Sequence, residues 1–319
     1  MRVSDLITFE ASWPEIRIIA TPEVPGPDER AYIVINLLYP DFFYWIYLIR
    51  MIIWIASYPK SGNTWVRSFL CNYFSDKKTF DFKQLSKINK FPRKQLFDQL
   101  NIDFTSFKNV SANWINMQEY INLKNETVYL KTHNAMATIS NSKFTNANNT
   151  SGFIYLVRDP RDVVLSYASH LGIEISETFN LMQDDYSFEM MKGTESKNVI
   201  LGSWATNYNS WKNFKMVDGL ILKYEDLVLN PEDSFLKIIT YISQIDNIEV
   251  NKNKIKSCIK NTSFDNLKNM EKNIGFSERG INSFFRKGKV GDWKENLNPK
   301  LISEIEKVFN KEMKELNYL

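Results

Sequence analysis

Residues 57–65 read SYPKSGNTW, and this short polar stretch is the most informative part of the sequence about the fold. It follows an apolar run at residues 51–56, MIIWIA, and precedes a helix-like segment at residues 66–74, VRSFLCNYF. The order is therefore a buried strand, a tight turn and a helix. Such a turn points several backbone N–H groups and the positive end of a helix at one place, which suits a phosphate. Lys60 adds a mobile charge there, and Trp65 adds a flat face for a base.

The turn differs from the P-loop of ATP-hydrolysing proteins, because no glycine stands in the required place before a Gly-Lys-Ser/Thr. We therefore expect a nucleotide that is not used in the manner of ATP. A Lys-Ser-Gly turn between a strand and a helix can also be purely structural. This loop alone leaves both interpretations open.

Two later segments favour a nucleotide site. Residues 152–157, GFIYLV, form a second buried-strand pattern that ends in RDPRD at residues 158–162. Pro160 suits the first turn of a helix, which VVLSY at residues 163–167 continues. Near the C-terminus, residues 286–294 read RKGKVGDWK, a local basic cluster sufficient for one doubly charged phosphate.

Together the three segments resemble the sulfotransferases that use 3′-phosphoadenosine 5′-phosphosulfate (PAPS). The first is similar to their 5′-phosphosulfate loop YPKSGxTW, the second to their 3′-phosphate motif RxPxDxxxSY, and the third to their RKGxxGDWK. The resemblance implies in-line transfer of a sulfuryl group from PAPS, as co-substrate, to an acceptor hydroxyl or amine. A small-molecule acceptor is favoured over a glycan, and no metal is implied.

Composition sets broad limits. The chain has 319 residues, 44% of them hydrophobic, which is enough for a substantial core. Its net charge is only +3, which argues against a dedicated nucleic-acid binder. Cys71 and Cys258 have no CxxC partner, and His133 and His170 are the only histidines, so no metal site is predicted. Cys71 fits a small core residue.

Residues 1–50 differ from the rest of the chain, which we expect to be one sulfotransferase domain at residues 51–319. They contain no lysine, whereas residues 51–319 contain thirty, and they hold five of the ten prolines. One interpretation is that Met51 is the natural start, and the other is a genuine N-terminal extension. The apolar run at residues 42–56 contains Arg50 and is shorter than the about 20 residues of a membrane-spanning helix. We therefore expect no stable membrane span, no signal peptide and a cytoplasmic protein.

Buried apolar strands alternate with helices along the rest of the chain. The predicted strands are residues 52–56, 128–131, 153–157 and 220–224, and the predicted helices are residues 63–74, 94–99, 161–170, 202–214, 231–244 and 301–316. This pattern predicts an α/β fold, a three-layer sandwich with a central parallel sheet flanked by helices. The resemblance implies the P-loop-NTPase-like sulfotransferase version. The loops after the strands should meet at one edge, and the Asn-rich residues 141–151 should form an exposed loop.

Sulfuryl transfer needs a cation and a base. Charge develops on the leaving phosphate oxygen, and Lys60 is the candidate to stabilise it. The acceptor must lose a proton, which suits a histidine. His133 follows the strand at residues 128–131 in a Lys-Thr-His that the family uses for its base, whereas we interpret His170 as a helix-end or pocket-lining residue. In the family, the serine matching Ser166 also restrains the catalytic lysine until the acceptor arrives.

The resemblance also implies a set of PAPS-binding residues. Arg158 and Ser166 should bind the 3′-phosphate, with the C-terminal loop closing over it. Trp65 and Phe264 should hold the adenine, and Tyr224 matches an adenine-side tyrosine, although it also fits a core tyrosine at a strand end. The full set is Lys60, Ser61, Gly62, Asn63, Thr64, Trp65, Arg158, Ser166, Tyr224, Thr262, Ser263, Phe264, Arg286, Lys287 and Gly288.

The sequence departs from the family pattern in three places. Asn63 replaces a Thr or other small polar residue, although its backbone N–H can still serve. Asn207 replaces the histidine of a GSWxxH segment, which casts doubt on any acceptor contact there. The dimer segment KxxxTVxxxE is absent, so the family dimer is not assumed.

We expect the acceptor pocket to come from residues 80–118, 134–150 and 172–200. The last segment carries an apolar group that either lines the pocket or packs against the domain: Phe179, Met182, Tyr186, Phe188, Met190 and Met191.

Two other functions remain as alternatives. A P-loop-type kinase or hydrolase would need the missing turn and a magnesium-binding carboxylate, and a non-catalytic nucleotide-binding protein would be favoured by loss of Lys60 or His133, both of which are present.

Overall fold

A computed structural model describes residues 18–19, 32–36, 43–47, 51–189 and 198–319. The chain divides into two compact units, Met1–Ile49 and Arg50–Leu319. In the first unit, three antiparallel strands form a sheet in the order β1 (Ile18–Ile19), β2 (Tyr32–Asn36) and β3 (Phe43–Tyr47). Much of the atypical N-terminal segment lies outside the described residues, as do Met190 and Met191.

The second unit is built on a five-stranded sheet in the order β10-β9-β4-β6-β5, and all four pairings are parallel. Its strands are β4 (Ile52–Ser57), β5 (Asn89–Lys90), β6 (Val128–Thr132), β9 (Thr150–Val157) and β10 (Gly219–Lys223). From β4 the chain forms β5 and β6 on one side of that strand and then β9 and β10 on the other. Ligands of open α/β sheets bind beside such a reversal, at the carboxyl ends of the strands.

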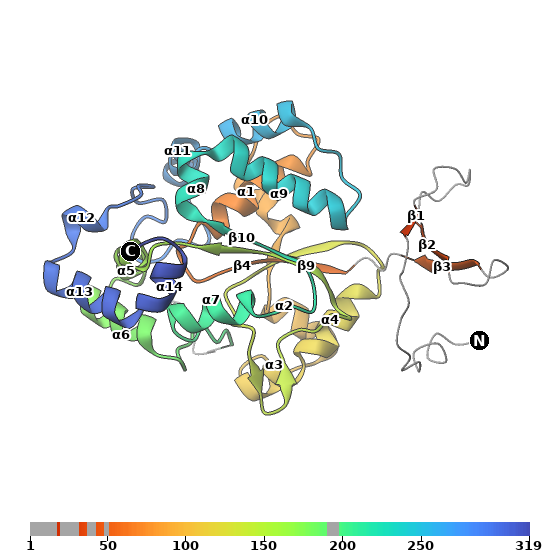
Figure 1. Cartoon of the computed structure of the whole chain (residues 1–319), viewed down its shortest axis with the longest axis horizontal. Coiled ribbons are helices and arrows are strands. Elements are labelled where there is room, and N and C mark those ends of the chain that lie inside the picture. The colour runs from red at the N-terminus through yellow and green to blue at the C-terminus, as the bar shows by residue number, and fades with distance from the viewer. Residues whose placement is uncertain (1–17, 20–31, 37–42, 48–50, 190–197) are drawn as a thin grey trace. The chain divides into compact units, whose positions relative to one another are not determined.

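Helices cover both faces of this sheet, so the predicted three-layer architecture is confirmed (Figure 1). The helical elements are α1 (Asn63–Tyr73), η2 (Phe82–Lys87), α2 (Lys94–Phe97), η3 (Asp98–Leu100), α3 (Phe107–Ala112), α4 (Trp114–Asn122), α5 (Pro160–Leu171), α6 (Ile175–Gln183), α7 (Trp204–Lys212), α8 (Tyr224–Leu229), α9 (Pro231–Ile245), α10 (Lys252–Asn261), α11 (Phe264–Ile274), α12 (Trp293–Asn296), α13 (Pro299–Val308) and α14 (Asn310–Glu315). A small hairpin joins β7 (Thr138–Ile139) to β8 (Ser142–Lys143).

Alternate residues of β4 supply the two cores. Ile53 and Ile55 belong to the core shared with α1, α9 and α10, whereas Ile52 and Trp54 belong to the core shared with α4, α5 and α7. Successive side chains of a strand point to opposite faces, so a strand covered on both faces is apolar throughout. This explains why residues 51–56 read as one continuous apolar run.

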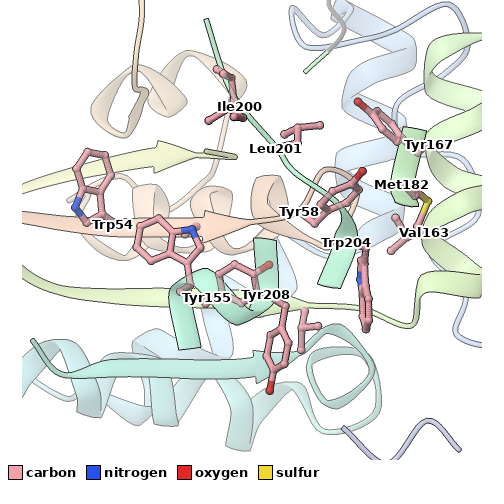
Figure 2. Close-up of a cluster of buried hydrophobic side chains, with 14 of the residues drawn as sticks. Trp54, Tyr58, Tyr155, Val163, Tyr167, Met182, Ile200, Leu201, Trp204 and Tyr208 are labelled. Atoms are coloured by element: carbon pink, nitrogen blue, oxygen red, sulfur yellow. The ribbon is translucent and has the colours of Figure 1, made fainter. Parts of the chain in front are cut away.

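The core shared with α4, α5 and α7 is rich in aromatic side chains. Figure 2 shows Trp54 and Tyr155 from the strands together with Trp204 and Tyr208 from α7. Trp204 and Trp211, predicted to share one face of their helix, are both buried. Their indole N–H groups donate to the carbonyls of Arg158 (3.2 Å) and Asn134 (2.8 Å). Each buried side chain of this size contributes about 1.5–3 kcal/mol, and these two also tie α7 to the loops that follow β9 and β6.

Three predicted elements are wrong in detail. The strand at residues 220–224 ends at Lys223, and Tyr224 begins α8. The single helix at residues 301–316 is two, α13 and α14, separated at Phe309. Residues 141–151 are not simply an exposed loop, because Phe144 is buried against Trp54 and its carbonyl accepts a hydrogen bond from a side-chain amide on α4.

Candidate active site

The loop after β4 is shaped by its backbone. Lys60 and Gly62 both lie in the left-handed region, with φ of 65° and 97°, and Gly62 is the N-cap of α1. A Cβ on Gly62 would lie 2.7 Å from Cδ2 of Tyr224, so only glycine fits. The side-chain amide of Asn63 donates to the Ile55 carbonyl (3.0 Å), which ties the loop to its strand and leaves the backbone N–H groups of the first helical turn free of side-chain caps.

Arg158 joins the loop after β4 to the C-terminal loop. Its guanidinium donates to the carbonyls of Lys60 (3.2 Å) and Lys289 (3.0 Å), and it lies 4.3 Å from the centroid of the Tyr224 ring. The residue follows β9 directly, at the same sheet edge as Lys60. Two segments separated by more than two hundred residues are therefore held around one arginine.

The C-terminal loop is anchored on the first turn of α5. The carboxylate of Asp162 accepts from the backbone N–H groups of Gly291 (2.8 Å) and Trp293 (3.0 Å). Asp292 pairs with Arg286 and Lys287, both at 2.7 Å. The RKGKVGDWK segment thus brings its basic residues to the helix that also carries Ser166.

These segments surround one cavity of about 390 Å³. Of the predicted site residues, the structure places in its wall Lys60, Gly62, Asn63, Thr64, Trp65, His133, Arg158, Ser166, Tyr224, Ser263, Phe264, Arg286, Lys287 and Gly288. Ser61 and Thr262 are fully buried and are not part of this wall, and the Thr262 hydroxyl, directly after α10, donates to the Cys258 carbonyl of that helix. Six basic side chains but only two carboxylates line the cavity, which favours an anionic ligand.

One wall of the cavity is aromatic and apolar. Trp65 lies edge-on to Tyr224, with ring centroids 6.4 Å apart, and Phe264 at the start of α11 packs against the backbone of Gly288. Sequence reasoning missed the aliphatic residues beside them: Val228, Pro231, Ile259 and Leu267. They come from α8 through α11 and carry no recognisable motif.

The ring of His133 is held in one orientation. Its Nδ1 lies 2.7 Å from the Ser57 carbonyl oxygen, which can only accept, so Nδ1 carries the proton and Nε2 keeps its lone pair. Burial, together with the nearby charge of Lys131, lowers the pKa of His133 to about 3. The imidazole is therefore neutral at physiological pH and can accept a proton at Nε2.

Lys60 is half-buried in the same cavity. Burial, together with the charges of Lys131 and Arg158, lowers the pKa of Lys60 to about 7. Its ammonium lies 3.5 Å from the centroid of the Phe284 ring. The resemblance led us to expect a contact with Ser166, but among the hydrogen bonds of the described residues none joins the two. The aromatic ring is the partner of the lysine in this structure.

Five further charged residues interact with one another beside the cavity, and we call them the charged cluster: Arg67, Lys90, Lys131, Glu189 and Glu278. Arg67 and Lys131 pair with Glu278 at 2.6 and 3.0 Å, and Lys90 pairs with Glu189 at 2.5 Å. Burial would raise the pKa of Glu189, but Lys90 and its neighbours hold that pKa at about 2. Only Lys131, in the Lys-Thr-His segment, carried a sequence signal.

The expected acceptor segments contribute little to this cavity. Of residues 80–118, 134–150 and 172–200, only Glu189 lines it within the described part of the chain. Phe179 and Met182 pack in the core, and Tyr186 is 80% exposed. Phe188 packs edge-on against Phe107. The alternative that this apolar group packs against the domain therefore holds for Phe179, Met182 and Phe188.

Asn207, which replaces a family histidine, is a structural residue here. Its amide donates to the carbonyls of His133 (3.0 Å) and Leu201 (2.8 Å), and its oxygen accepts from the Tyr155 hydroxyl (2.8 Å). It is fully buried and lies outside the cavity wall. The substitution therefore holds the backbone of the candidate base instead of facing the cavity.

A sequence model of the sulfotransferase domain matches residues 51–317 of this chain, which is most of its length. The chain belongs to the sulfotransferase family. It is 26% identical over 278 residues to cytosolic sulfotransferase 16 of Arabidopsis thaliana, covering 83% of this chain and 77% of that one. It is also 26% identical over 274 residues to flavonol 3-sulfotransferase of Flaveria bidentis (82% and 81% covered), and 21% identical over 273 residues to an amine sulfotransferase of Oryctolagus cuniculus (82% and 81%).

Solved sulfotransferase structures share the fold. Retinol dehydratase in complex with androsterone and the inactive cofactor PAP aligns over 90% of both chains, with a TM-score of 0.54 and 17% identity. A mouse sulfotransferase complexed with PAP aligns over 84% of this chain and 85% of that one, with a TM-score of 0.51 and 21% identity. The domain match and the named relatives establish an enzyme of the sulfotransferase class, a transferase of the EC 2.8.2 type.

No helix among the described residues is long and apolar enough to cross a membrane. No group of three or more His, Cys, Asp or Glu side chains in the same part of the chain is arranged to hold a metal ion.

Proposed function

We propose that this sulfotransferase uses PAPS as its donor and sulfates a hydroxyl or amine of a small-molecule acceptor, with a glycan as the less favoured acceptor class. The observation that carries the proposal is the single cavity shared by the loop after β4, the start of α5 and the C-terminal loop, with His133 in its wall. Its volume of about 390 Å³ is typical of a ligand site. The relatives named for amines and flavonols support this acceptor class.

The polar groups of the cavity fit a nucleotide bearing two phosphates. Trp65 Nε1 and Arg158 Nε are buried and have no hydrogen-bond partner among the described residues. Buried donors of this kind are rare unless a ligand or water satisfies them. Arg158, Ser166 and Arg286–Gly288 would hold the 3′-phosphate, and Lys60–Trp65 the 5′-phosphosulfate. Trp65, Tyr224 and Phe264 would hold the adenine.

PAPS supplies the sulfuryl group when bound, and the chain supplies a cation and a base. Lys60 neutralises the charge that appears on the phosphate oxygen as its bond to sulfur breaks. His133 takes the proton of the acceptor at Nε2 while the new bond to sulfur forms. Ser57 fixes the tautomer that this step requires. No metal takes part in this scheme.

A thermal-unfolding experiment tests the donor. Adenosine 3′,5′-bisphosphate (PAP) without magnesium should raise the unfolding temperature, because a ligand at about 100 times its Kd adds about 2.7 kcal/mol. Stabilisation only by ATP with magnesium would favour a P-loop-type kinase or hydrolase instead. Transfer from labelled PAPS to pooled acceptors then separates an enzyme from a non-catalytic nucleotide-binding protein.

We propose further that residues 51–319 carry the whole site and that residues 1–50 are an extension that catalysis does not use. The sulfotransferase match begins at residue 51, and along the chain the first compact unit ends at Ile49 and the second begins at Arg50. Intact-mass measurement of the native protein decides whether the mature chain starts upstream of Met51. The names of two relatives, cytosolic sulfotransferases 16 and 17, support a cytoplasmic location, which cell fractionation tests.

A further inference from the structure

One carboxylate in the cavity collects three donors. Oε1 of Glu278 lies 2.6 Å from a terminal guanidinium nitrogen of Arg67, and Oε2 lies 3.0 Å from the Lys131 ammonium. The Thr64 hydroxyl donates to the same Oε2 at 3.3 Å. The side chains of Arg67 and Lys131 are only 3% and 8% exposed. Two nearly buried cations and a hydroxyl that converge on one group form an anion-binding pocket.

Glu278 lies on a short connection that is bound to another helix. Glu278 lies between α11 and Arg286, in a segment bound to the last turn of α5. The Ile281 N–H donates to the His170 carbonyl (3.1 Å), and the Asn282 amide donates to the Ser169 carbonyl (2.8 Å). A Cβ on Gly280 would lie 2.1 Å from the His170 carbonyl oxygen, so the close approach requires glycine. The connection is therefore seated on α5, with Glu278 pointing into the cavity.

The negative charge of Glu278 opposes a second anion at the same place. Burial would raise the pKa of Glu278, but Lys131 and Arg67 outweigh it and hold that pKa well below its usual range, so the group is ionised at neutral pH. Thr64 belongs to the loop assigned to the 5′-phosphosulfate. A nucleotide anion next to Thr64 would face an ionised carboxylate. Without Glu278 or a ligand anion, however, Arg67 would lose its paired carboxylate and Lys131 would keep only the more distant charge of Glu189, which is unfavourable for buried cations.

We propose that the Glu278 carboxylate occupies the pocket of Thr64, Arg67 and Lys131 in the ligand-free enzyme. When the nucleotide binds, Glu278 leaves this pocket and an anionic group of the donor takes its place. The inference rests on the proposed function, because it takes the ligand to be a phosphorylated nucleotide. Binding then exchanges one anion for another. The exchange keeps the two cations paired at every stage and lowers the apparent affinity for the nucleotide.

The test is calorimetric titration of the full chain with PAP, without magnesium. Glu278→Gln removes the competing charge and should bind PAP roughly ten-fold more tightly than wild type, within the usual range of coupling energies. The ligand-free variant should also unfold at a lower temperature and regain more stability with PAP. Glu189→Gln is the matched control: it removes a charge from the same cavity, but from the pair with Lys90, and should change the Kd far less.

The outcomes separate the two proposals. If wild type does not bind PAP, the proposed function fails. If wild type binds PAP, the proposed function stands. The exchange at Glu278 is then wrong if Glu278→Gln binds PAP no more tightly than wild type, or if both glutamine variants gain the same affinity for PAP. Should Glu278→Gln not fold, Glu278→Asp keeps the charge but is one methylene shorter and cannot reach all three donors. It should bind PAP a few-fold more tightly, and unchanged or weaker binding overturns the inference.

Discussion

The motif residues and the charged cluster meet at the same cavity, which the cluster reaches through Lys131, Glu189 and Glu278. Arg158 of the motif residues is held differently from this cluster. Arg158 donates to two backbone carbonyls, lies 3.7 Å from the Asp162 carboxylate, and keeps its Nε without a hydrogen-bond partner among the described residues. The charged cluster is paired internally, with Arg67 and Lys131 on Glu278 and Lys90 on Glu189. The first arrangement is ready for an anion, whereas the second must give up a partner to accept one. The four predictions below test this difference.

Lys60→Ala should have the largest effect on turnover. Removing the one cation assigned to the leaving oxygen should cost about 1,000-fold, comparable to the loss of an oxyanion donor. Single-turnover transfer from labelled PAPS measures this loss. PAP affinity should fall much less, because Arg158 and the C-terminal loop supply other contacts. Turnover within ten-fold of wild type would remove Lys60 from the mechanism.

His133→Ala should cost roughly 100-fold in turnover, the usual loss for a general base. His170→Ala is the control, because His170 lines the same cavity but is not positioned by a bond like that of His133 to Ser57. We expect a clearly smaller loss for the control under the same steady-state assay. Equal losses for both variants would mean that neither histidine is a dedicated base.

The contrast between the two sets explains what the sequence could predict. The strand, turn and helix around Lys60 are contiguous, so their apolar run and polar turn revealed both the fold and the phosphate loop. His133 and Arg158 each follow a strand of a parallel sheet, and the carboxyl ends of such strands share an edge. Their meeting could therefore be expected from the sequence alone.

The pairing of the charged cluster could not be predicted in the same way. Arg67, Lys131, Glu189 and Glu278 come from a helix, a strand and two connections, and no spacing rule joins them. Apart from Lys131 in its Lys-Thr-His segment, each reads as an ordinary surface charge until the fold brings it into the cluster. The positions of Phe179 and Met182 could not be predicted either, because an apolar side chain suits a pocket or a core equally well. Only the packing of α6 against the rest of the domain decided between them.

PAP affinity should depend on pH through Lys60. In the free protein the pKa of Lys60 is about 7, and bound phosphates favour the ammonium and raise that pKa, so binding takes up a proton above pH 7. Affinity should be highest below about pH 7 and fall by at most about ten-fold per pH unit above it. Titration calorimetry across this range measures the slope.

Lys60→Arg is the matched control for this pH dependence. Arginine stays charged throughout the range, so the slope should disappear. His133 and His170 have pKa values of about 3 and 4 in the free protein and do not titrate there. A slope that persists in the arginine variant would assign the titration to another group.

The smallest predicted effect concerns Phe284, which links the two sets because it follows Glu278 in the same connection and touches Lys60. Its ring holds the Lys60 ammonium at 3.5 Å in the ligand-free protein and competes with the phosphate for that charge. Phe284→Leu removes a cation–π contact worth about 0.5–1 kcal/mol, so at pH 6 PAP should bind about two- to five-fold more tightly. Phe276→Leu is the control, because Phe276 packs on Phe284 in the same aromatic group and has no contact with the lysine. Tighter binding for the Phe284 variant alone would show that this connection restrains Lys60 as well as Lys131, whereas weaker binding would mean that the ring contacts the nucleotide.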